Sequence, residues 1–169
     1  MDTDTTPPKL IRVYDLHHDR AYVESVQTAT LTSKDFGLVP EHGLFGSDEW
    51  WLAVDSGDIA VRVTEGEITD VFDTGHRDYP VFALSGRTWT RQTSETDDRT
   101  LTRPEKWAAF RKGVYARVRF AIQRHRRSDW GLSECVLSID LGMEIGTRAT
   151  EMARRSSLLD VFRKPRREN

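Results

Sequence analysis

The sequence predicts one α+β domain built on a mainly antiparallel sheet. Short segments of β-type composition fill the first half of the chain, and the two longest segments with helical periodicity follow residue 101. A chain of 169 residues has room for one hydrophobic core. Strands followed by helices are typical of α+β folds, in which the helices cover one face of a sheet. We therefore expect a single domain at residues 10–163, with a disordered lead-in at 1–9 and a basic tail at 164–169.

The first half supplies most of the predicted sheet. Residues 10–14 have the composition of a first strand, and residues 21–31 are rich enough in β-branched side chains to favour a second strand over a short helix. An antiparallel meander is expected over residues 59–91. Glu65–Gly66 is its predicted first turn, because Gly66 can adopt the positive φ that a tight hairpin requires. The expected meander strands are 59–64, 67–72, 81–84 and 87–91, with Ser85–Gly86 as a second turn.

Residues 47–57 predict a short helix rather than a catalytic loop. Ser47 is a preferred N-cap residue, because its hydroxyl can accept a hydrogen bond from the first helical turn. Asp48 and Glu49 interact favourably with the positive end of the helix dipole, and Gly57 is well suited to end the helix.

The second half supplies the two predicted covering helices. Thr102–Glu105 matches a capping box, with proline in the first turn, where it is tolerated. Apolar residues then recur at helical spacing, which predicts a long helix over residues 102–127. Residues 135–141 are expected to form a further strand, and residues 147–163 a C-terminal helix.

Charge is distributed unevenly along the chain. The formal net charge is −2, but residues 1–98 carry 8 Lys and Arg against 19 Asp and Glu, whereas residues 99–169 carry 17 against 8. Such asymmetry is typical of a protein with a charged partner, unless the two halves neutralise each other. The acidic half suggests an anionic surface with embedded aromatic residues, which suits docking onto a basic protein. The candidate binding residues are Asp48, Glu49, Trp50, Asp55, Asp58, Glu65, Glu67 and Tyr79.

Several function classes find little support in the sequence. No run approaches the roughly 20 apolar residues that span a bilayer, and the acidic start differs from a secretory signal, so a cytoplasmic location is predicted. Cys135 is the only cysteine, which excludes an intrachain disulfide and a zinc site made of cysteines. We expect no metal and no cofactor.

Two alternatives remain open. His17, His76 and Asp78 could form a metal- or histidine-dependent site for phosphoester hydrolysis, although nothing local brings them together. The basic face of the predicted helix 102–127 could instead bind nucleic acid through its phosphates. The residues of that face are Lys112, Arg119 and Arg126.

The favoured hypothesis is a small intracellular interaction module that is not an enzyme. It depends on the acidic, aromatic-bearing central region and on the lack of a convincing catalytic set. Inhibitors of basic enzymes, such as the toxin-neutralising proteins of bacteria, are one class with this size and charge. That analogy depends on charge and size alone.

Overall fold

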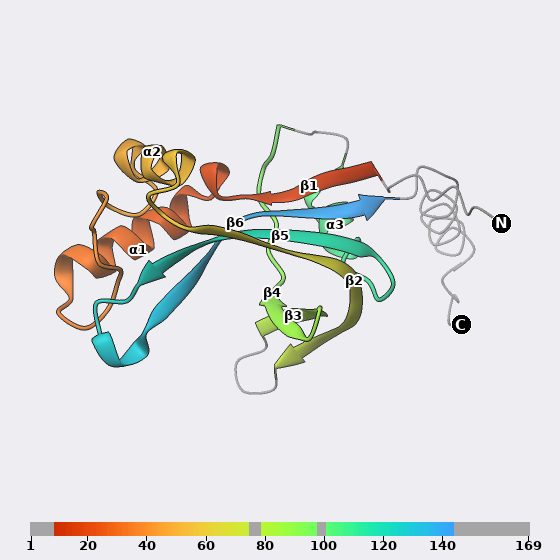
Figure 1. The fold of residues 1–169 in the computed structure, drawn as a ribbon. Helices are drawn as coiled ribbons and strands as arrows, with labels where there is room; N and C mark the ends of the chain where they lie inside the picture. Colours follow the sequence, from red (N-terminus) through yellow and green to blue (C-terminus); the bar gives the residue numbers. More distant parts are fainter. Residues whose placement is uncertain (1–8, 75–78, 98–100, 144–169) are drawn as a thin grey trace, which may run out of the picture.

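The structure, a computed structural model, describes residues 9–74, 79–97 and 101–143. Within these residues it has one six-stranded antiparallel sheet and three α-helices, which confirms the predicted α+β class (Figure 1). No helix in the described part is long and apolar enough to cross a membrane. The elements are β1 (Lys9–Asp15), η1 (Leu16–His18), α1 (Arg20–Thr32), α2 (Asp48–Ser56), β2 (Val61–Thr74), β3 (Tyr79–Leu84), β4 (Arg87–Thr90), α3 (Arg103–Ala108), β5 (Tyr115–Arg124), η2 (Ser128–Trp130) and β6 (Leu132–Met143).

The sheet has the strand order β1-β6-β5-β2-β3-β4, and each neighbouring pair is antiparallel. β2 joins its two parts, because Val61–Glu67 pairs with β5 and Ile68–Thr74 pairs with β3. Gly66 lies at the junction with a φ of 151°, a conformation that other residues rarely adopt. β2 bends along its length in Figure 1, so β3 and β4 turn away from the rest of the sheet.

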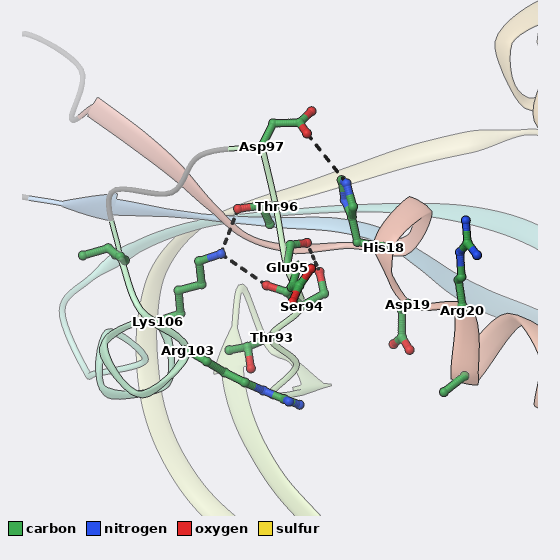
Figure 2. A pocket seen from close by; sticks show the side chains of 12 residues that line it. His18, Asp19, Arg20, Thr93, Ser94, Glu95, Thr96, Asp97, Arg103 and Lys106 are labelled. Carbon is green, nitrogen blue, oxygen red and sulfur yellow. Dashed lines mark hydrogen bonds and ion pairs between the residues drawn. The ribbon is translucent and has the colours of Figure 1, made fainter.

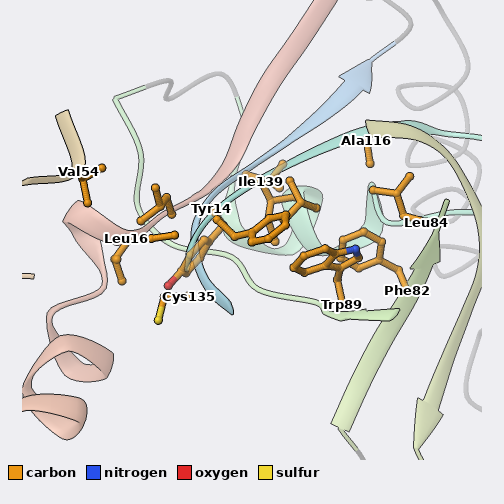
Figure 3. Packing of buried hydrophobic residues seen from close by; sticks show 14 of the residues in the cluster. Tyr14, Leu16, Val54, Phe82, Leu84, Trp89, Ala116, Cys135 and Ile139 are labelled. Carbon is orange, nitrogen blue, oxygen red and sulfur yellow. The ribbon is translucent and has the colours of Figure 1, made fainter. Parts of the chain in front are cut away.

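The main core lies between the β3–β4 hairpin and one face of β5 and β6. Phe82 and Trp89 of the hairpin lie in the same buried cluster as Ala116 of β5 and Ile139 of β6 (Figure 3). The ring of Trp89 packs 4.9 Å from that of Phe120. The bend in β2 therefore brings the hairpin's inner face against β5 and β6, and Phe110, just after α3, adds a ring 5.2 Å from that of Phe82.

α2 packs on the opposite face of the sheet, at one end of the molecule (Figure 1). Side chains alternate along β5, so Gln123 points away from the face that carries Phe120. Trp50 of α2 is fully buried, and its indole Nε1 donates a hydrogen bond of 2.8 Å to Oε1 of Gln123. α1 is tied to the segment before α2, because Gln27 Nε2 donates to the backbone oxygen of Phe45 at 2.8 Å.

The predicted strand at residues 21–31 is wrong, because this segment forms most of α1. The carboxylate of Asp19 caps the helix by accepting a 3.2 Å hydrogen bond from the backbone N–H of Tyr22. Val23 and Val26 are three residues apart, and both pack against the core. Burial of this helical face outweighs the weak preference of β-branched residues for strands.

The predicted long helix over residues 102–127 is also wrong. Its capping box exists, since the backbone N–H of Thr102 donates to Glu105 Oε2 at 2.7 Å, but α3 has only six residues. Gly113 follows with a φ of 83°, which a right-handed helix cannot contain. β5 then begins, and every second residue is buried from Ala116 to Phe120. The apolar residues used to predict helical spacing belong in part to this strand of period two.

The remaining predicted elements divide into three groups. The turn at Glu65–Gly66 is wrong, because β2 runs through it as one strand. The turn at Ser85–Gly86 and its flanking strands are confirmed as the β3–β4 hairpin, and the strand at 135–141 is confirmed within β6. The helix predicted at 147–163, the tail at 164–169, and the lead-in at 1–9 apart from Lys9 lie outside the described residues.

Candidate interaction surfaces

α2 begins and ends as the sequence predicts. The hydroxyl of Ser47 accepts a hydrogen bond of 3.3 Å from the backbone N–H of Trp50, and Gly57 closes the helix in the left-handed conformation with a φ of 86°. Trp50 was predicted to lie on the binding surface, and this is wrong because its side chain is fully buried. Its apolar ring faces the core, and Gln123 satisfies its single donor.

The outer side of α2 carries only acidic and apolar or small side chains. Asp48, Glu49, Asp55 and, just beyond the helix, Asp58 are exposed, and Leu52 between them is 69% exposed. No Lys, Arg or His among the described residues forms a salt bridge with these four carboxylates. We call Asp48, Glu49, Leu52, Asp55 and Asp58 the acidic α2 face. It presents unpaired negative charge around one apolar side chain.

The other predicted acids lie apart from this face. Glu65 and Glu67 are on β2, and Glu65 accepts a hydrogen bond of 2.7 Å from Arg117 Nε on β5. This bond lowers the pKa of Glu65 below its ordinary value. In the next strand, Asp140 lies opposite Arg117 and accepts a hydrogen bond of 2.8 Å from Arg12 Nε of β1.

These four charges alternate in sign across β2, β5, β6 and β1, so Glu65 belongs to a largely neutral row. Glu67 is exposed two residues further along β2. The side chain of Tyr79, and residues His76 and Asp78, lie outside the part of the chain that can be described.

The three basic residues predicted to share one helix lie on different segments. Lys112 is in the turn before β5, Arg119 is in β5, and Arg126 follows β5. Arg126 has a structural contact, because its guanidinium donates to the backbone oxygens of Thr30 and Ser33 at the end of α1. The proposed cationic helix for nucleic acid therefore does not exist.

His17, the first candidate catalytic residue, packs against α2. Its ring stacks on Trp51 with centroids 3.8 Å apart and an interplanar angle of 13°. Its Nδ1 lies 3.0 Å from Oδ1 of Asp15. These contacts fix the position of α2 relative to η1. The partners proposed for His17 in catalysis, His76 and Asp78, are not described, so this site remains a prediction.

A pocket of about 930 Å³ opens where the end of η1, the start of α1, residues 93–97 and α3 meet (Figure 2). Lys106 of α3 is buried in its wall, and Arg20 and Arg103 line it from two helices. Three acidic residues, Asp19, Glu95 and Asp97, also line it. Sequence reasoning missed this pocket, because residues 102–127 were predicted to form one long helix and no local pattern shows that Lys106 faces residues 93–97.

Comparison with known protein families gives a match. Residues 10–146 match the family described as immunity protein RhsI2. The chain belongs to this family. No curated protein matches the sequence. Membership supports a toxin-neutralising role that is carried out through protein–protein interaction, with a toxin as the partner.

A member of an immunity protein family needs a surface that another protein can cover. Besides the acidic α2 face, a second surface with exposed apolar side chains lies at the tip of the β5–β6 hairpin. Phe36 and Trp130 meet edge to face with centroids 5.6 Å apart, and Leu132, two residues after Trp130, is also exposed. Arg127 lies 5.0 Å over the Trp130 ring. We call Phe36, Trp130 and Leu132 the hairpin-end patch. The sequence signal was Trp130 and Leu132 within a polar, glycine-containing stretch, but Phe36 is 94 positions away from Trp130.

Proposed function

We propose that this protein neutralises its toxin by docking the acidic α2 face onto a basic surface of the toxin. The observation that carries this proposal is the set of four exposed carboxylates with no cationic partner in the described structure, arranged around the exposed side chain of Leu52. Membership in the RhsI2 immunity protein family supports a toxin partner. The sign of the charge on that partner, and the choice of α2, are inferences from the surface.

The two kinds of side chain on the acidic α2 face have different roles. Carboxylates attract a basic partner over about 8–10 Å at ordinary salt and so speed the encounter. An apolar side chain at the centre of such a surface loses water on contact and slows dissociation. Leu52 is therefore expected to act mainly on the dissociation rate, and Asp48 and Asp55 mainly on the association rate.

The helix that carries this face is held rigidly from beneath. Trp50 is buried and bonded to Gln123, and Trp51 stacks on His17. A surface that is already ordered before binding loses less conformational entropy when the complex forms. α2 is therefore suited to tight binding even though it is only nine residues long.

The test is a binding measurement with the toxin itself. The tagged protein captures its partner from the native host, the partner is identified and purified, and association and dissociation rates are measured at several salt concentrations. The double variant Asp48→Lys/Asp55→Lys should lower the association rate at least about tenfold and reduce its salt dependence.

The matched control is Asp35→Lys/Asp70→Lys, which changes the net charge equally at exposed positions away from α2. It should change the rate much less than the α2 variant. Equal effects of the two double variants would show that only net charge matters, and the docking face would have to be sought elsewhere.

We also propose that the protein acts in the cytoplasm. This proposal follows from the single cysteine, which is buried as a free thiol. Fractionation of the native host with antibody detection tests it, and recovery of the protein from a membrane or secreted fraction would contradict it.

A further inference from the structure

The pocket beside α3 contains a buried positive charge. Lys106 is only 4% exposed, and its Nζ donates hydrogen bonds to the backbone oxygen of Ser94 at 3.2 Å and to Thr96 Oγ1 at 2.8 Å (Figure 2). Both acceptors are neutral. No carboxylate of the described residues lies within ion-pair distance of this ammonium group.

This arrangement is unusual for lysine. Lysine side chains are almost never fully buried unless an opposite charge accompanies them, because removing an ammonium group from water is costly. An ammonium group has three N–H donors, and two of them are satisfied here. No carboxylate of the described residues therefore pairs with Lys106, and a bound anion would supply a negative charge for it.

Two further cations line the same pocket, and neither has a partner among the described residues. Arg103 stands on the α3 side and Arg20 on the α1 side (Figure 2). Neither guanidinium forms a hydrogen bond or ion pair with the residues that the structure describes. Guanidinium groups bind carboxylate and phosphate through paired N–H donors, which makes these two side chains suitable walls for an oxyanion.

The acids of the pocket are mostly engaged in other contacts. Asp19 accepts hydrogen bonds from the Tyr14 hydroxyl at 3.1 Å and from the Tyr22 backbone. Asp97 lies 3.7 Å from His18 Nε2, and its side chain faces solvent. Glu95 is exposed, and its carboxylate has no hydrogen bond or ion pair with any described residue. Its negative charge would repel an anion at the rim of the pocket.

We propose that this pocket binds a small anionic ligand through the cationic side chains in its lining, Lys106, Arg103 and Arg20. A volume of about 930 Å³ lies in the range of small-molecule sites and exceeds what a single phosphate ion needs, so the ligand is a phosphate or carboxylate attached to a larger group. The site does not depend on the acidic α2 face, and it goes beyond the toxin-binding role.

The experiment uses the full chain and simple probes. Calorimetric titration and thermal unfolding are measured with inorganic phosphate, pyrophosphate and citrate, each against potassium chloride at the same ionic strength. At least one of the three ions should raise the unfolding temperature of the wild-type protein above that in the potassium chloride control. A larger response to pyrophosphate assigns the site to phosphate ligands, and a larger response to citrate assigns it to carboxylate ligands.

Variants identify the pocket as the place of binding. Lys106→Met keeps the volume of the side chain and should abolish the response, and Arg103→Gln, at an exposed position, should weaken binding at least about tenfold. Glu95→Gln should tighten binding, because it removes the free carboxylate at the rim. Lys112→Met, an exposed lysine outside the pocket, is the matched control and should leave the response unchanged.

The outcomes that overturn the proposal are distinct from those that bear on toxin binding. The proposed anion site would be contradicted if no ion stabilised the protein beyond the chloride control. It would also be contradicted if Arg103→Gln responded as the wild type does. The variant Asp48→Lys/Asp55→Lys should keep the anion response while it loses toxin binding, so either proposal can fail without the other.

Discussion

The indole nitrogen of Trp50 donates a hydrogen bond of 2.8 Å to the side-chain oxygen of Gln123, and this bond joins α2 to the end of β5. Gln123 is held in turn, because its Nε2 donates to the backbone oxygen of Val39 at 3.0 Å. One buried amide therefore connects α2, β5 and the loop between α1 and α2. Buried polar groups linked in this way favour one arrangement of the elements, because any other would leave a donor or acceptor unpaired.

This bond gives the first prediction. Trp50→Phe keeps most of the buried ring but leaves Gln123 Oε1 without its donor, so the free energy of unfolding should fall by about 1–3 kcal/mol. Denaturant unfolding measures the loss. Trp130→Phe is the control, since Trp130 is partly exposed and has no such bond, and it should cost less than about 0.5 kcal/mol. Equal losses in the two variants would show that the bond adds nothing.

A second prediction separates backbone strain from steric contact at two glycines. Gly113 has a φ of 83° and open space around it, so Gly113→Ala should cost about 1–2 kcal/mol of stability through the backbone alone. Gly37 has a φ of 94°, and an added Cβ would lie 2.5 Å from Cα of Thr30. Gly37→Ala should therefore cost at least about 1 kcal/mol more, as judged by the same unfolding measurement. A smaller loss at Gly37 would contradict the close approach to α1.

The pH dependence of stability should report on Asp15. Burial raises the pKa of this carboxyl, but hydrogen bonds from the backbone N–H and ring of His17, both 3.0 Å, together with the charge of Arg12, leave the pKa below its ordinary value. A folded pKa below the unfolded value of about 4 means that the stabilisation is present above that pH and is lost as the pH falls through the folded pKa.

Asp15→Asn removes this titration. The stability difference between wild type and this variant should be largest above about pH 5 and should shrink as the pH falls below about 4. Urea unfolding at a series of pH values measures it. A difference that stays constant from pH 6 to pH 2 would mean that Asp15 has the same pKa in both states.

Cys135 should not react with thiol reagents while the protein is folded. Its side chain is buried in β6, and burial raises the pKa of the thiol to about 11, so the reactive thiolate is scarce at neutral pH. A thiol reagent at pH 7.5 should label none of the native protein within minutes and one equivalent in denaturant. Fast labelling of the native protein would contradict this burial.

The role of Leu52 in toxin binding can be tested against another exposed leucine. Leu52→Ser should weaken toxin binding about tenfold, mainly through faster dissociation, with little change in the unfolding midpoint because the side chain is already exposed. Leu132→Ser in the hairpin-end patch is the matched control, since Leu132 is exposed to a similar degree. A larger loss of toxin affinity with Leu132→Ser would show that the toxin binds at the hairpin-end patch.

Some elements could be predicted because their signals are local. Ser47 and Gly57 fix the ends of α2 through hydrogen bonding and backbone conformation within the helix itself. The turn at Ser85–Gly86 likewise depends on two adjacent residues. The capping box at Thr102 was read correctly, but it marks only where a helix begins, so the length of α3 was not predictable from it.

The errors arose where the deciding partner lies far away in the chain. Residues 115–124 became a strand because β2 and β6 pair with its two edges, and these pairings reach back to Val61 and forward to Leu141. Gly66 resembles a hairpin residue in sequence, yet it lies inside β2, where the strand passes from one partner to the next.

The sequence by itself determined the fold class, the capped helix with its outward carboxylates and the uneven charge, because these follow from residue type and from neighbours within a few positions. Only the tertiary structure decided that Trp50 faces inward, that Glu65 is neutralised by Arg117, and that Lys106 lines a pocket with Arg20. Each of these depends on two residues that lie 52 to 86 positions apart in the chain. A pattern among neighbouring residues does not show which distant segment will supply the partner.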